Sequence, residues 1–377
     1  MQRILVLGAG KIGALISGLL AESGAYQVDL ADRLPEAAAG VATAHGLPGI
    51  TAYELDASDE AALYTHLRAH PADAIISGLP YYCNPGVARA ARAANAHYFD
   101  LTEDVAVTRA VREIAEGAAT AFVPQCGLAP GFVSIVANHL AGRFDPLRDL
   151  IMRVGALPLY PTNALGYNLT WSTEGLINEY LNPCEAIVDG REIEVPALEE
   201  IEHISLDGLD YEAFNTSGGL GTLCETYAGK LQTLNYKTVR YPGHRDVIKL
   251  LVKDLGLGRR REVLKDVLEA AIPMTLQDVV LVFVSASGMR DGRLTQESDA
   301  RKIYAGEIAG VQRSAIQITT AAGLCTMVDL LVAGRLPRQG FVRQEQASLD
   351  DFLANRFGRV YASEKLALGG PARALVA

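Results

Sequence analysis

The sequence predicts an α/β fold in which a doubly wound domain with a parallel sheet is followed by a second α+β domain. Three observations favour it. An apolar run at residues 3–7 leads directly into a glycine-rich turn at residues 8–13. Strand-like and helix-like segments alternate to about residue 135, and beyond about residue 140 strand-like runs are mixed with charged helical stretches. The chain of 377 residues is also longer than one hydrophobic core usually supports, which predicts about two domains.

The first strand, turn and helix carry a nucleotide-binding pattern. Residues 3–7 read as a strand buried on both faces, residues 12–22 as an amphipathic helix, and residues 27–31 as a second strand ending at Asp32. In this setting Gly8 permits the tight turn, Gly10 admits a pyrophosphate and Gly13 allows close packing of helix on strand. The helix N-terminus favours the negative charge. The pattern predicts a Rossmann dinucleotide-binding domain.

Asp32 indicates which dinucleotide is preferred. It follows Gly13 by 19 residues, where a carboxylate accepts hydrogen bonds from the adenosine ribose hydroxyls. A carboxylate repels a 2′-phosphate, whereas the adjacent Arg33 attracts one, so NAD is favoured and NADP stays open. The expected cofactor contacts are Gly8, Gly10, Lys11, Ile12, Gly13, Asp32, Arg33, Asp56, Gly78, Leu79, Pro80, Leu128, Pro130 and Gly131.

The alternation of strands and helices continues through the first domain. Strands are expected at residues 73–77, 96–100 and 121–124, with a helix at 85–95. In doubly wound sheets the ligand crevice lies outside the carboxyl ends of the strands. The loops at residues 79–84, 100–104 and 125–131 are therefore the primary site candidates.

The second domain is expected at residues 136–316, with substrate binding and oligomerisation as its roles. Strands are expected at residues 150–154 and 279–284, and amphipathic helices at 246–257 and 261–271. A long apolar helix at residues 317–331 is expected to return to the first domain, which otherwise spans residues 1–135, together with the rest of the chain to residue 377.

Composition and charge exclude several kinds of partner. Thirty-four Lys and Arg residues face 44 Asp and Glu residues, and no dense basic run is present, which argues against nucleic acid and anionic membranes. No apolar segment is expected to be long enough to span a bilayer, and no signal peptide is recognised, so a cytoplasmic location is expected. Five scattered cysteines without CxxC spacing predict reduced thiols and no metal site.

Five motifs together resemble the saccharopine dehydrogenase family, in the branch that includes glutamate-forming saccharopine dehydrogenase and lysine 6-dehydrogenase. The likeness spans nearly the whole chain and rests on the order of the motifs. They are residues 8–13 (GAGKIG), 77–81 (SGLPY), 127–132 (GLAPGF), 216–220 (TSGGL) and 240–244 (RYPGH).

The resemblance implies hydride transfer from the carbon that bears the lysine ε-nitrogen to a nicotinamide cofactor. Saccharopine reductases of the family typically carry an acid where this chain has Ala129, which favours the lysine 6-dehydrogenase branch, as do residues 174–180, His244, Asp32 and the compact length. The alternatives are an NAD(P)-dependent glutamate-forming saccharopine dehydrogenase, a carboxynorspermidine-type dehydrogenase and a catalytically inactive NAD-binding sensor. The substrate is expected to be a small amino acid, and the assembly a homodimer or higher homo-oligomer.

Candidate catalytic residues follow from the proton that must leave the substrate ammonium group, whose free pKa is about 10.4. His244 is the expected base because imidazole titrates near neutrality and this one follows a Pro-Gly turn, although capping of a helix explains it equally well. Tyr81 is expected to relay a proton or to stack near the nicotinamide, and Asp100 to hold an amino group. Glu103 and Asp104 are more simply helix-start acids.

Candidate substrate contacts come from both halves of the chain. Arg240 offers a planar fork for the substrate α-carboxylate, with a surface or interdomain ion pair as the alternative. Gly218 and Gly219 offer backbone N–H groups to the same carboxylate, or mark a flexible loop. Tyr82 is expected to lie near the reacting groups. Cys126 is read as a buried structural thiol because hydride chemistry needs no covalent intermediate.

Overall fold

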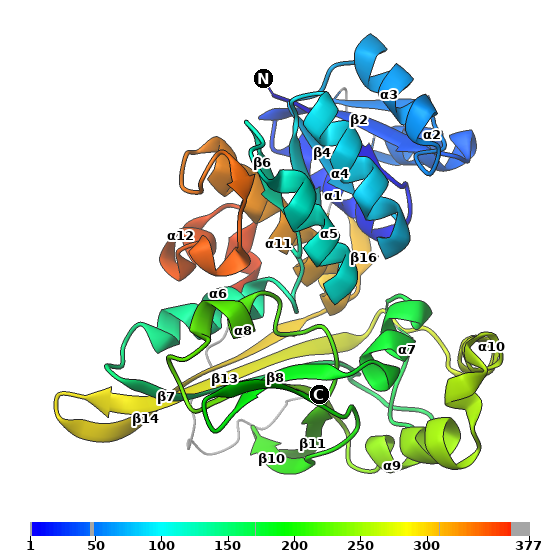
Figure 1. Cartoon of the computed structure of the whole chain (residues 1–377). Helices are drawn as coiled ribbons and strands as arrows, with labels where there is room; N and C mark the ends of the chain where they lie inside the picture. The colour runs from blue at the N-terminus through cyan, green and yellow to red at the C-terminus, as the bar shows by residue number, and fades with distance from the viewer. Residues whose placement is uncertain (1, 46–48, 170, 309, 363–377) are drawn as a thin grey trace. The chain divides into compact units, whose positions relative to one another are not determined.

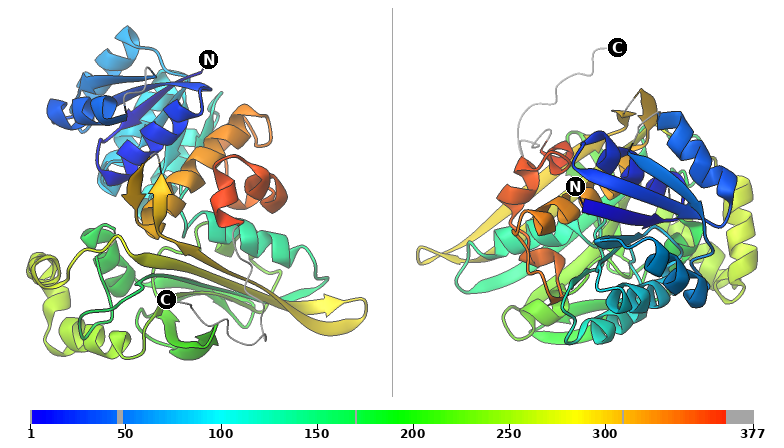
Figure 2. Two further views of the ribbon diagram at one scale, coloured as in Figure 1. Left: turned by 180° about the vertical axis from the view of Figure 1, so that it is seen from behind. Right: turned by 90° about the horizontal axis from the view of Figure 1, so that it is seen from above.

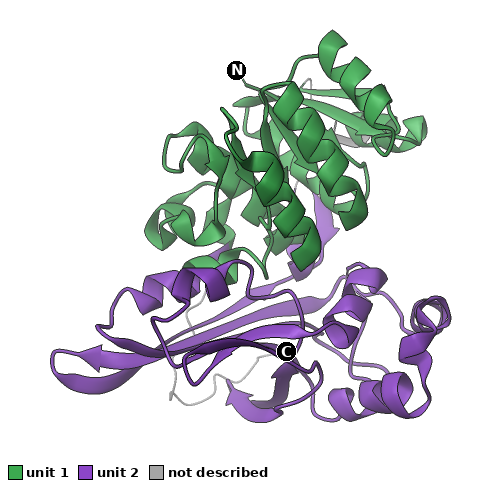
Figure 3. Ribbon diagram, viewed as in Figure 1, with its two compact units in different colours: residues 1–135, 317–360 green, residues 136–316, 361–377 purple. Residues whose placement is uncertain are grey.

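The computed structural model describes residues 2–45, 49–169, 171–308 and 310–362, which form two compact units (Figure 3). The first unit comprises Met1–Ile135 and Gln317–Val360, and the second comprises Val136–Ile316 and Tyr361–Ala377. The expected return of the chain to the first domain therefore ends at residue 360. Residues 363–377 of that expected return lie outside the described residues.

A seven-stranded parallel sheet forms the centre of the first unit, and its strand order is β17-β6-β5-β4-β1-β2-β3. The order reverses between β1 and β4, which makes the carboxyl ends of these two strands the expected ligand crevice. The predicted doubly wound fold is thus confirmed. The strands are β1 (Gln2–Leu7), β2 (Tyr26–Asp32), β3 (Ile50–Glu54), β4 (Ala74–Ser77), β5 (His97–Asp100), β6 (Ala121–Val123) and β17 (Gly340–Phe341).

Helices cover both faces of this sheet (Figures 1 and 2). One face packs on α3 (Glu60–Ala69), α4 (Asn84–Ala93) and α5 (Val105–Ala115), whose buried residues Leu63, Val87 and Val111 share a core with Leu5 and Ile75 of the sheet. On the other face lie α1 (Lys11–Glu22), α2 (Pro35–His45) and α11 (Ala315–Val332). The short helices η1 (Tyr81–Cys83), η4 (Gln344–Gln346), α12 (Leu349–Ala354) and η5 (Gly358–Tyr361) complete the described helical elements that lie mainly in this unit.

Helix α11 corrects one expectation. Its 18 residues are long and apolar enough to cross a membrane by length and composition, contrary to the prediction that no segment is. However, 78% of the helix is buried inside the protein, as is typical of a core helix. Its Asp329 accepts a hydrogen bond from the Tyr26 hydroxyl at the start of β2 and pairs with Arg356. The return of the chain therefore builds part of the first unit's core.

An eight-stranded mixed sheet forms the second unit, with strand order β10-β11-β12-β7-β13-β14 and with β8 and β9 joined to it through β12. Its long strands β7 and β13 extend well beyond the runs predicted at residues 150–154 and 279–284, and the equally long β14 was not predicted. The strands are β7 (Leu147–Pro158), β8 (Cys184–Val188), β9 (Arg191–Val195), β10 (Glu202–Leu206), β11 (Leu209–Asn215), β12 (Thr233–Arg240), β13 (Asp278–Arg290) and β14 (Arg293–Tyr304). A separate ribbon consists of β15 (Gly306–Ile308) and β16 (Val311–Arg313).

Short helices in the second unit frame the carboxyl end of β12. A buried cluster joins Leu176 and Tyr180 of α7 with Phe214 of β11, Ile248 of α9 and Leu264 of α10. The predicted helix at residues 246–257 is wrong in extent, because α9 ends at Lys249 and a π-helical turn, η2, follows it. The helical elements are α6 (Phe132–Ala141), which joins the two units, α7 (Thr173–Leu181), α8 (Leu223–Tyr227), α9 (His244–Lys249), η2 (Leu250–Asp254), η3 (Leu257–Arg259) and α10 (Arg261–Ala271).

Candidate functional site

The glycine turn after β1 has the geometry of a pyrophosphate cradle. Gly8 has φ of +95°, and a Cβ atom there would lie 2.9 Å from the Gly78 carbonyl oxygen. A Cβ at Gly13 would lie 1.9 Å from the Gly8 carbonyl oxygen, so both glycines are required by the fold itself. A Cβ at Gly10, in contrast, would meet nothing within 4 Å. The space beside Gly10 is therefore left open for a ligand.

The start of α1 suits an anion. Gly10 is its N-cap and has no side chain to cap the helix, and no acidic residue occupies the first turn. Lys11 is exposed and Ile12 half-buried directly after Gly10. The positive end of the helix dipole favours a phosphate at this position.

Asp32 fixes the same turn from the neighbouring strand. Its Oδ2 accepts a hydrogen bond from the Ala9 N–H at 2.7 Å, and its Oδ1 accepts one from the Leu34 N–H at 2.9 Å. The carboxylate thus stays at the carboxyl end of β2, where a dinucleotide's ribose hydroxyls bind. Arg33 beside it is exposed. The residues present here fit a dinucleotide.

Asp56 lies just after the carboxyl end of β3 and is exposed. Its Oδ1 accepts hydrogen bonds from the Ser58 hydroxyl at 2.6 Å and the Ser58 N–H at 3.0 Å, and these bonds hold its pKa below the ordinary range. Since β3 pairs with β2, Asp56 shares one sheet edge with Asp32. Its predicted cofactor role stays a prediction.

Two further loops lie at the carboxyl edge of the first sheet, as predicted. After β4, the Gly78 N–H donates to the Leu7 carbonyl oxygen, Tyr81 is half-buried and Tyr82 is 65% exposed. After β6, a Cβ at Gly131 would lie 2.1 Å from the Gly127 carbonyl oxygen, so this turn also requires glycine. The predicted contacts Leu79, Pro80, Leu128 and Pro130 belong to these two loops. Tyr81 packs on the core while Tyr82 points to solvent, and both roles stay predictions.

Asp100 has a positioning role in the structure. It is fully buried, and three donors already bind its carboxylate: the Tyr98 hydroxyl at 2.7 Å, the Thr102 N–H at 3.0 Å and the Gln125 N–H at 2.9 Å. These contacts tie the end of β5 to the loop after β6. The prediction that Asp100 holds a substrate amino group is therefore corrected, because its oxygens are sequestered within the protein. Burial raises the pKa of this carboxyl to about 6.

This raised pKa predicts a pH dependence of stability. The folded pKa of about 6 lies above the value near 3.9 of an unfolded aspartate, so the folded state binds the proton more tightly. The contribution of Asp100 to the free energy of unfolding should fall by roughly 3 kcal/mol as the pH rises from about 4 to 6, and stay constant above that range. Chemical denaturation across this pH range would measure it.

The variant Asp100→Asn supplies the control. An amide oxygen accepts from the Thr102 and Gln125 N–H groups, and the amide NH₂ donates to the Tyr98 hydroxyl, so the fold should persist. The difference in unfolding free energy between Asp100→Asn and the native chain should then grow with pH and level off above about pH 6. Parallel stability curves for the two proteins would contradict a raised Asp100 pKa.

Three neighbouring titratable residues, Glu103, Asp104 and Cys126, lie at the same edge of the sheet. Burial raises the pKa of Glu103 to about 7, so its charge changes near neutrality. Asp104 caps α5 by accepting the Val107 N–H at 2.8 Å, which is the structural role predicted for it. Cys126 is buried, its thiol lies 3.0 Å from the Val123 carbonyl oxygen, and burial raises the pKa of the thiol. A thiol in such surroundings is a poor nucleophile.

A second candidate site lies in the second unit, at the carboxyl end of β12. Arg240 is 3% exposed, and its guanidinium lies 4.7 Å from the centre of the Tyr167 ring. Its Nε donates to the Tyr180 hydroxyl at 3.3 Å and its Nη1 donates to the Val239 carbonyl oxygen at 2.9 Å. Its Nη2 lies 3.6 Å from Oε2 of Glu179. The surface ion pair considered as an alternative is excluded because Arg240 is buried, and its charged neighbour Glu179 belongs to the same unit.

His244 orients this arginine instead of facing solvent. It is 1% exposed, with Nδ1 2.9 Å from the Leu165 carbonyl oxygen and Nε2 2.9 Å from the Tyr180 hydroxyl. A carbonyl only accepts, so we assign the ring proton to Nδ1, and Nε2 accepts from Tyr180. Burial, reinforced by Arg240, lowers the pKa of His244 to about 3. The predicted base role is corrected to positioning, because both ring nitrogens are engaged.

A buried carboxylate holds the turn that carries His244. Glu212 accepts hydrogen bonds from the Gly243 N–H at 2.8 Å and from the Arg245 N–H at 2.6 Å, at the start of α9. Gly243 has φ of +95°, a conformation that favours glycine. Glu212 was not among the predicted residues, because its link to the turn spans about thirty residues.

The glycine loop at residues 216–221 lies beside the same network. A Cβ at Gly219 would lie 2.2 Å from the Tyr236 ring, so packing alone requires this glycine. Gly218 has φ of +89°, and the Ser217 N–H donates to the Glu179 carbonyl oxygen at 3.1 Å. These contacts link the loop to Glu179 and to Tyr236 of β12, and the predicted substrate roles of Gly218 and Gly219 stay predictions. The close packing against Tyr236 explains why glycine is needed at position 219 without invoking a ligand.

Sequence reasoning missed Glu179, Tyr180, Tyr167 and Tyr236. One signal was available, because Tyr236 and Arg240 share one face of β12 by the two-residue period of a strand. Glu179 and Tyr180 stand in the stretch at residues 174–180, which the resemblance singled out without assigning a role.

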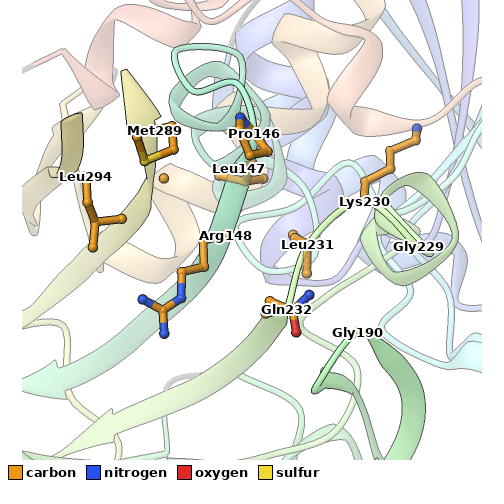
Figure 4. Close-up of a pocket in the computed structure, with 11 residues that line it drawn as sticks. Pro146, Leu147, Arg148, Gly190, Gly229, Lys230, Leu231, Gln232, Met289 and Leu294 are labelled. Carbon is orange, nitrogen blue, oxygen red and sulfur yellow. The ribbon is translucent and has the colours of Figure 1, made fainter. Parts of the chain in front are cut away.

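A pocket of about 430 Å³ lies at the other end of this sheet (Figure 4). Arg148 at the start of β7, Lys230 and Gln232 just before β12, and Leu294 of β14 contribute to its lining. Arg240 ends β12, whereas this pocket adjoins its beginning, so the pocket is separate from the Arg240 network. Among the described residues, no three His, Cys, Asp or Glu side chains are grouped as a metal site requires.

Comparisons with known proteins match both domains. Residues 4–123 match the family model for the saccharopine dehydrogenase NADP binding domain, and residues 127–359 match that for the saccharopine dehydrogenase C-terminal domain. Saccharopine dehydrogenase [NADP(+), L-glutamate-forming] of Pyricularia oryzae is 25% identical over 77% of this chain and 65% of its own length. The Saccharomyces cerevisiae protein of the same name is 25% identical over 68% of this chain and 58% of its own length.

A solved structure shares the fold. Apo saccharopine dehydrogenase (L-Glu forming) from Saccharomyces cerevisiae aligns with a TM-score of 0.75 at 17% identity, over 93% of this chain and 95% of that one. This likeness confirms the predicted two-domain α/β fold. The sequence matches cover less than two thirds of the length of the two fungal relatives.

Proposed function

The chain belongs to the saccharopine dehydrogenase family, and we propose that it is a nicotinamide-dependent dehydrogenase that oxidises the carbon bearing the ε-nitrogen of lysine. The observation that carries this proposal is the buried Arg240 fork, held by Tyr180 and Val239 in the family's C-terminal domain. A planar guanidinium in a fixed orientation suits the carboxylate of an amino acid.

The chemistry sets what the protein must supply. When bound, a nicotinamide dinucleotide accepts the hydride. The lysine side chain R–CH₂–NH₃⁺ then becomes the iminium R–CH=NH₂⁺, with two electrons and one proton leaving the carbon as hydride and one proton released to a base. Water then adds to the iminium carbon and the C–N bond breaks, which gives the semialdehyde and releases the nitrogen as ammonium. The glycine turn, the start of α1 and Asp32 would hold the dinucleotide, while Arg240 would anchor the far end of the substrate.

We infer that NAD is preferred over NADP. Asp32 is held at the carboxyl end of β2 by the Ala9 and Leu34 N–H groups, and a fixed negative charge there repels a 2′-phosphate. The fungal relatives are named for NADP, and they match this chain at only 25% identity. The nearby exposed Arg33 is the feature that favours NADP.

A second candidate is glutamate-forming saccharopine dehydrogenase, which the names of the fungal relatives favour. Saccharopine carries a second dicarboxylate arm, which needs further cationic partners. The network described around Arg240 contributes one guanidinium and also an acid, Glu179, which does not suit an additional carboxylate. Ala129 also stands where saccharopine reductases of the family typically carry an acid.

Absorbance at 340 nm tests the proposal. L-Lysine and L-saccharopine are each offered with NAD and with NADP, at mildly alkaline pH, where more of the substrate amine is unprotonated. We expect NADH formation with L-lysine and a lower rate with NADP. Reaction of saccharopine alone would establish the second candidate. If neither substrate gave NADH or NADPH, both candidates would be overturned. The variant Gly13→Ala controls for contaminating dehydrogenases.

A further inference from the structure

We propose that the pocket beside the start of β12 binds a monocarboxylate with an apolar chain, whose carboxylate is held by Arg148. The residues that line this pocket all belong to the second unit. Its volume of about 430 Å³ falls within the range of about 300–1,000 Å³ that is typical of small-ligand sites. The inference is independent of the proposed reaction, because the pocket is separate from the Arg240 network.

A β-bulge brings Arg148 into the pocket. Residues 287 and 288 of β13 pair with Asp149 and Leu147, so Arg148 is an extra residue of β7 without a partner on β13. Successive side chains of a regular strand point to opposite faces, and a bulge interrupts this alternation. Leu147 and Arg148 consequently both line the pocket.

The Arg148 guanidinium has donors left for a ligand. Its side chain makes no hydrogen bond to another residue of the described chain, and its Nε lies 3.7 Å from Oδ2 of Asp149. The Asp149 carboxylate already accepts the Ser287 hydroxyl at 2.7 Å. Figure 4 shows the guanidinium extending between Leu294 on one side and Gln232 on the other. Its terminal nitrogens therefore suit the two oxygens of one carboxylate.

The polar side of the pocket favours a single negative charge. The Gln232 N–H donates to the Arg148 carbonyl oxygen at 2.8 Å, so the two residues are neighbours, and the Gln232 amide adds a neutral donor. No Asp or Glu is among the described residues that line the pocket. Lys230 donates to the Thr226 carbonyl oxygen at 2.7 Å and points away from Arg148 (Figure 4). One guanidinium balances a monoanion better than it balances hydrogen phosphate.

An apolar wall lies beside these polar groups. Met289 and Leu294 are directly opposite each other on β13 and β14, so their side chains share one face of the hairpin. Leu294 is 60% exposed, and Leu147 and Leu231 continue the apolar lining. A hydrocarbon chain that covered this wall would add to the affinity, because it would remove apolar surface from water. The pocket therefore matches an acid with an apolar chain better than acetate.

Binding of octanoate tests the proposal at the pocket itself. The chain has five methionines, whose methyl groups can be labelled with ¹³C. Met289 lines the pocket, whereas Met274 is 56% exposed and lies just before the start of β13. We expect octanoate to shift the Met289 resonance, assigned with the variant Met289→Leu, and to leave that of Met274 unchanged. No shift of Met289 at millimolar octanoate, or equal shifts of both, would overturn the proposal.

Calorimetry separates the charge from the apolar chain. Octanoate should bind more tightly than acetate, 1-octanol or inorganic phosphate. Arg148→Gln should weaken octanoate binding by at least about tenfold, since a charge-assisted contact is lost. Lys230→Gln is the matched control, because it removes the same charge from a side chain that points elsewhere, and it should change the affinity by less than about twofold. Equal losses in the two variants would mean non-specific attraction by net charge, and tighter binding of 1-octanol or phosphate would contradict the proposed ligand class.

The variant Leu294→Glu tests the site from the apolar side, at a position that is 60% exposed. Its carboxylate would compete for Arg148 and repel the ligand, so octanoate binding should fall by at least about tenfold. Native affinity in Leu294→Glu would refute the site, and thermal unfolding checks that each variant is folded. None of these measurements involves catalysis, so their outcome does not depend on whether L-lysine is oxidised.

Discussion

Replacing Arg240 with methionine should lower kcat/KM for the amino-acid substrate by about 10²- to 10³-fold or more, since removal of one partner from a buried charge contact costs about 2–5 kcal/mol. Methionine fills a similar volume but offers no N–H group to a carboxylate. The loss should fall mainly on substrates that carry the carboxylate, so 1,5-diaminopentane should react almost equally with both proteins. Steady-state kinetics with L-lysine and this diamine would measure the contrast.

The same variant should also destabilise the fold. Arg240→Met removes the guanidinium 3.6 Å from the Glu179 carboxylate, and removal of one partner from a buried charge pair costs about 3–5 kcal/mol. The double variant Glu179→Gln/Arg240→Met should recover much of this loss. Chemical denaturation of the native chain, of the single variants Glu179→Gln and Arg240→Met, and of the double variant would complete this double-mutant cycle. Additive effects, with no recovery in the double variant, would mean that the two charges do not interact.

The parts of the fold that could be predicted are those encoded by nearby residues. The geometry of the turn at residues 8–13 depends on residues within that turn, because Gly13 packs directly against the Gly8 carbonyl group. The two-residue strand β17 could not be predicted, because it is too short for a periodic pattern and pairs with β6, about 220 residues earlier. Its formation depends on tertiary packing.

The candidate site shows the same limit. The sequence identified Arg240 and His244 as residue types suited to the chemistry, but a histidine's role depends on what its two nitrogens contact. For His244 these partners are Leu165 and Tyr180, which lie 79 and 64 residues away in sequence. Asp100 was misassigned for a similar reason, because one of its donors is the Gln125 N–H, 25 residues later. Local sequence therefore shows which side chains have suitable chemistry. It does not show whether their polar atoms are available to a substrate.

Replacing Gly13 with alanine should abolish dinucleotide binding and destabilise the first unit. The added Cβ would lie 1.9 Å from the Gly8 carbonyl oxygen, and since this atom belongs to the backbone of the turn, α1 must move away from β1. We expect a loss of cofactor affinity of at least about 10²-fold, with a fall in unfolding free energy of roughly 1–3 kcal/mol or more, as for overpacked cores. Fluorescence titration with NADH and thermal unfolding would measure the two effects.

The variant Gly10→Ala separates the cofactor site from the fold. A Cβ at Gly10 meets nothing within 4 Å, and its φ of −67° is ordinary for alanine, so the unfolding free energy should change by less than about 1 kcal/mol. The methyl group would nevertheless occupy the space that the pyrophosphate needs, so the affinity for NADH should fall at least about tenfold. Native affinity in Gly10→Ala would show that the cofactor does not approach this glycine. Equal destabilisation by both variants would mean that the two glycines serve the fold alike, and that Gly10 is not reserved for a ligand.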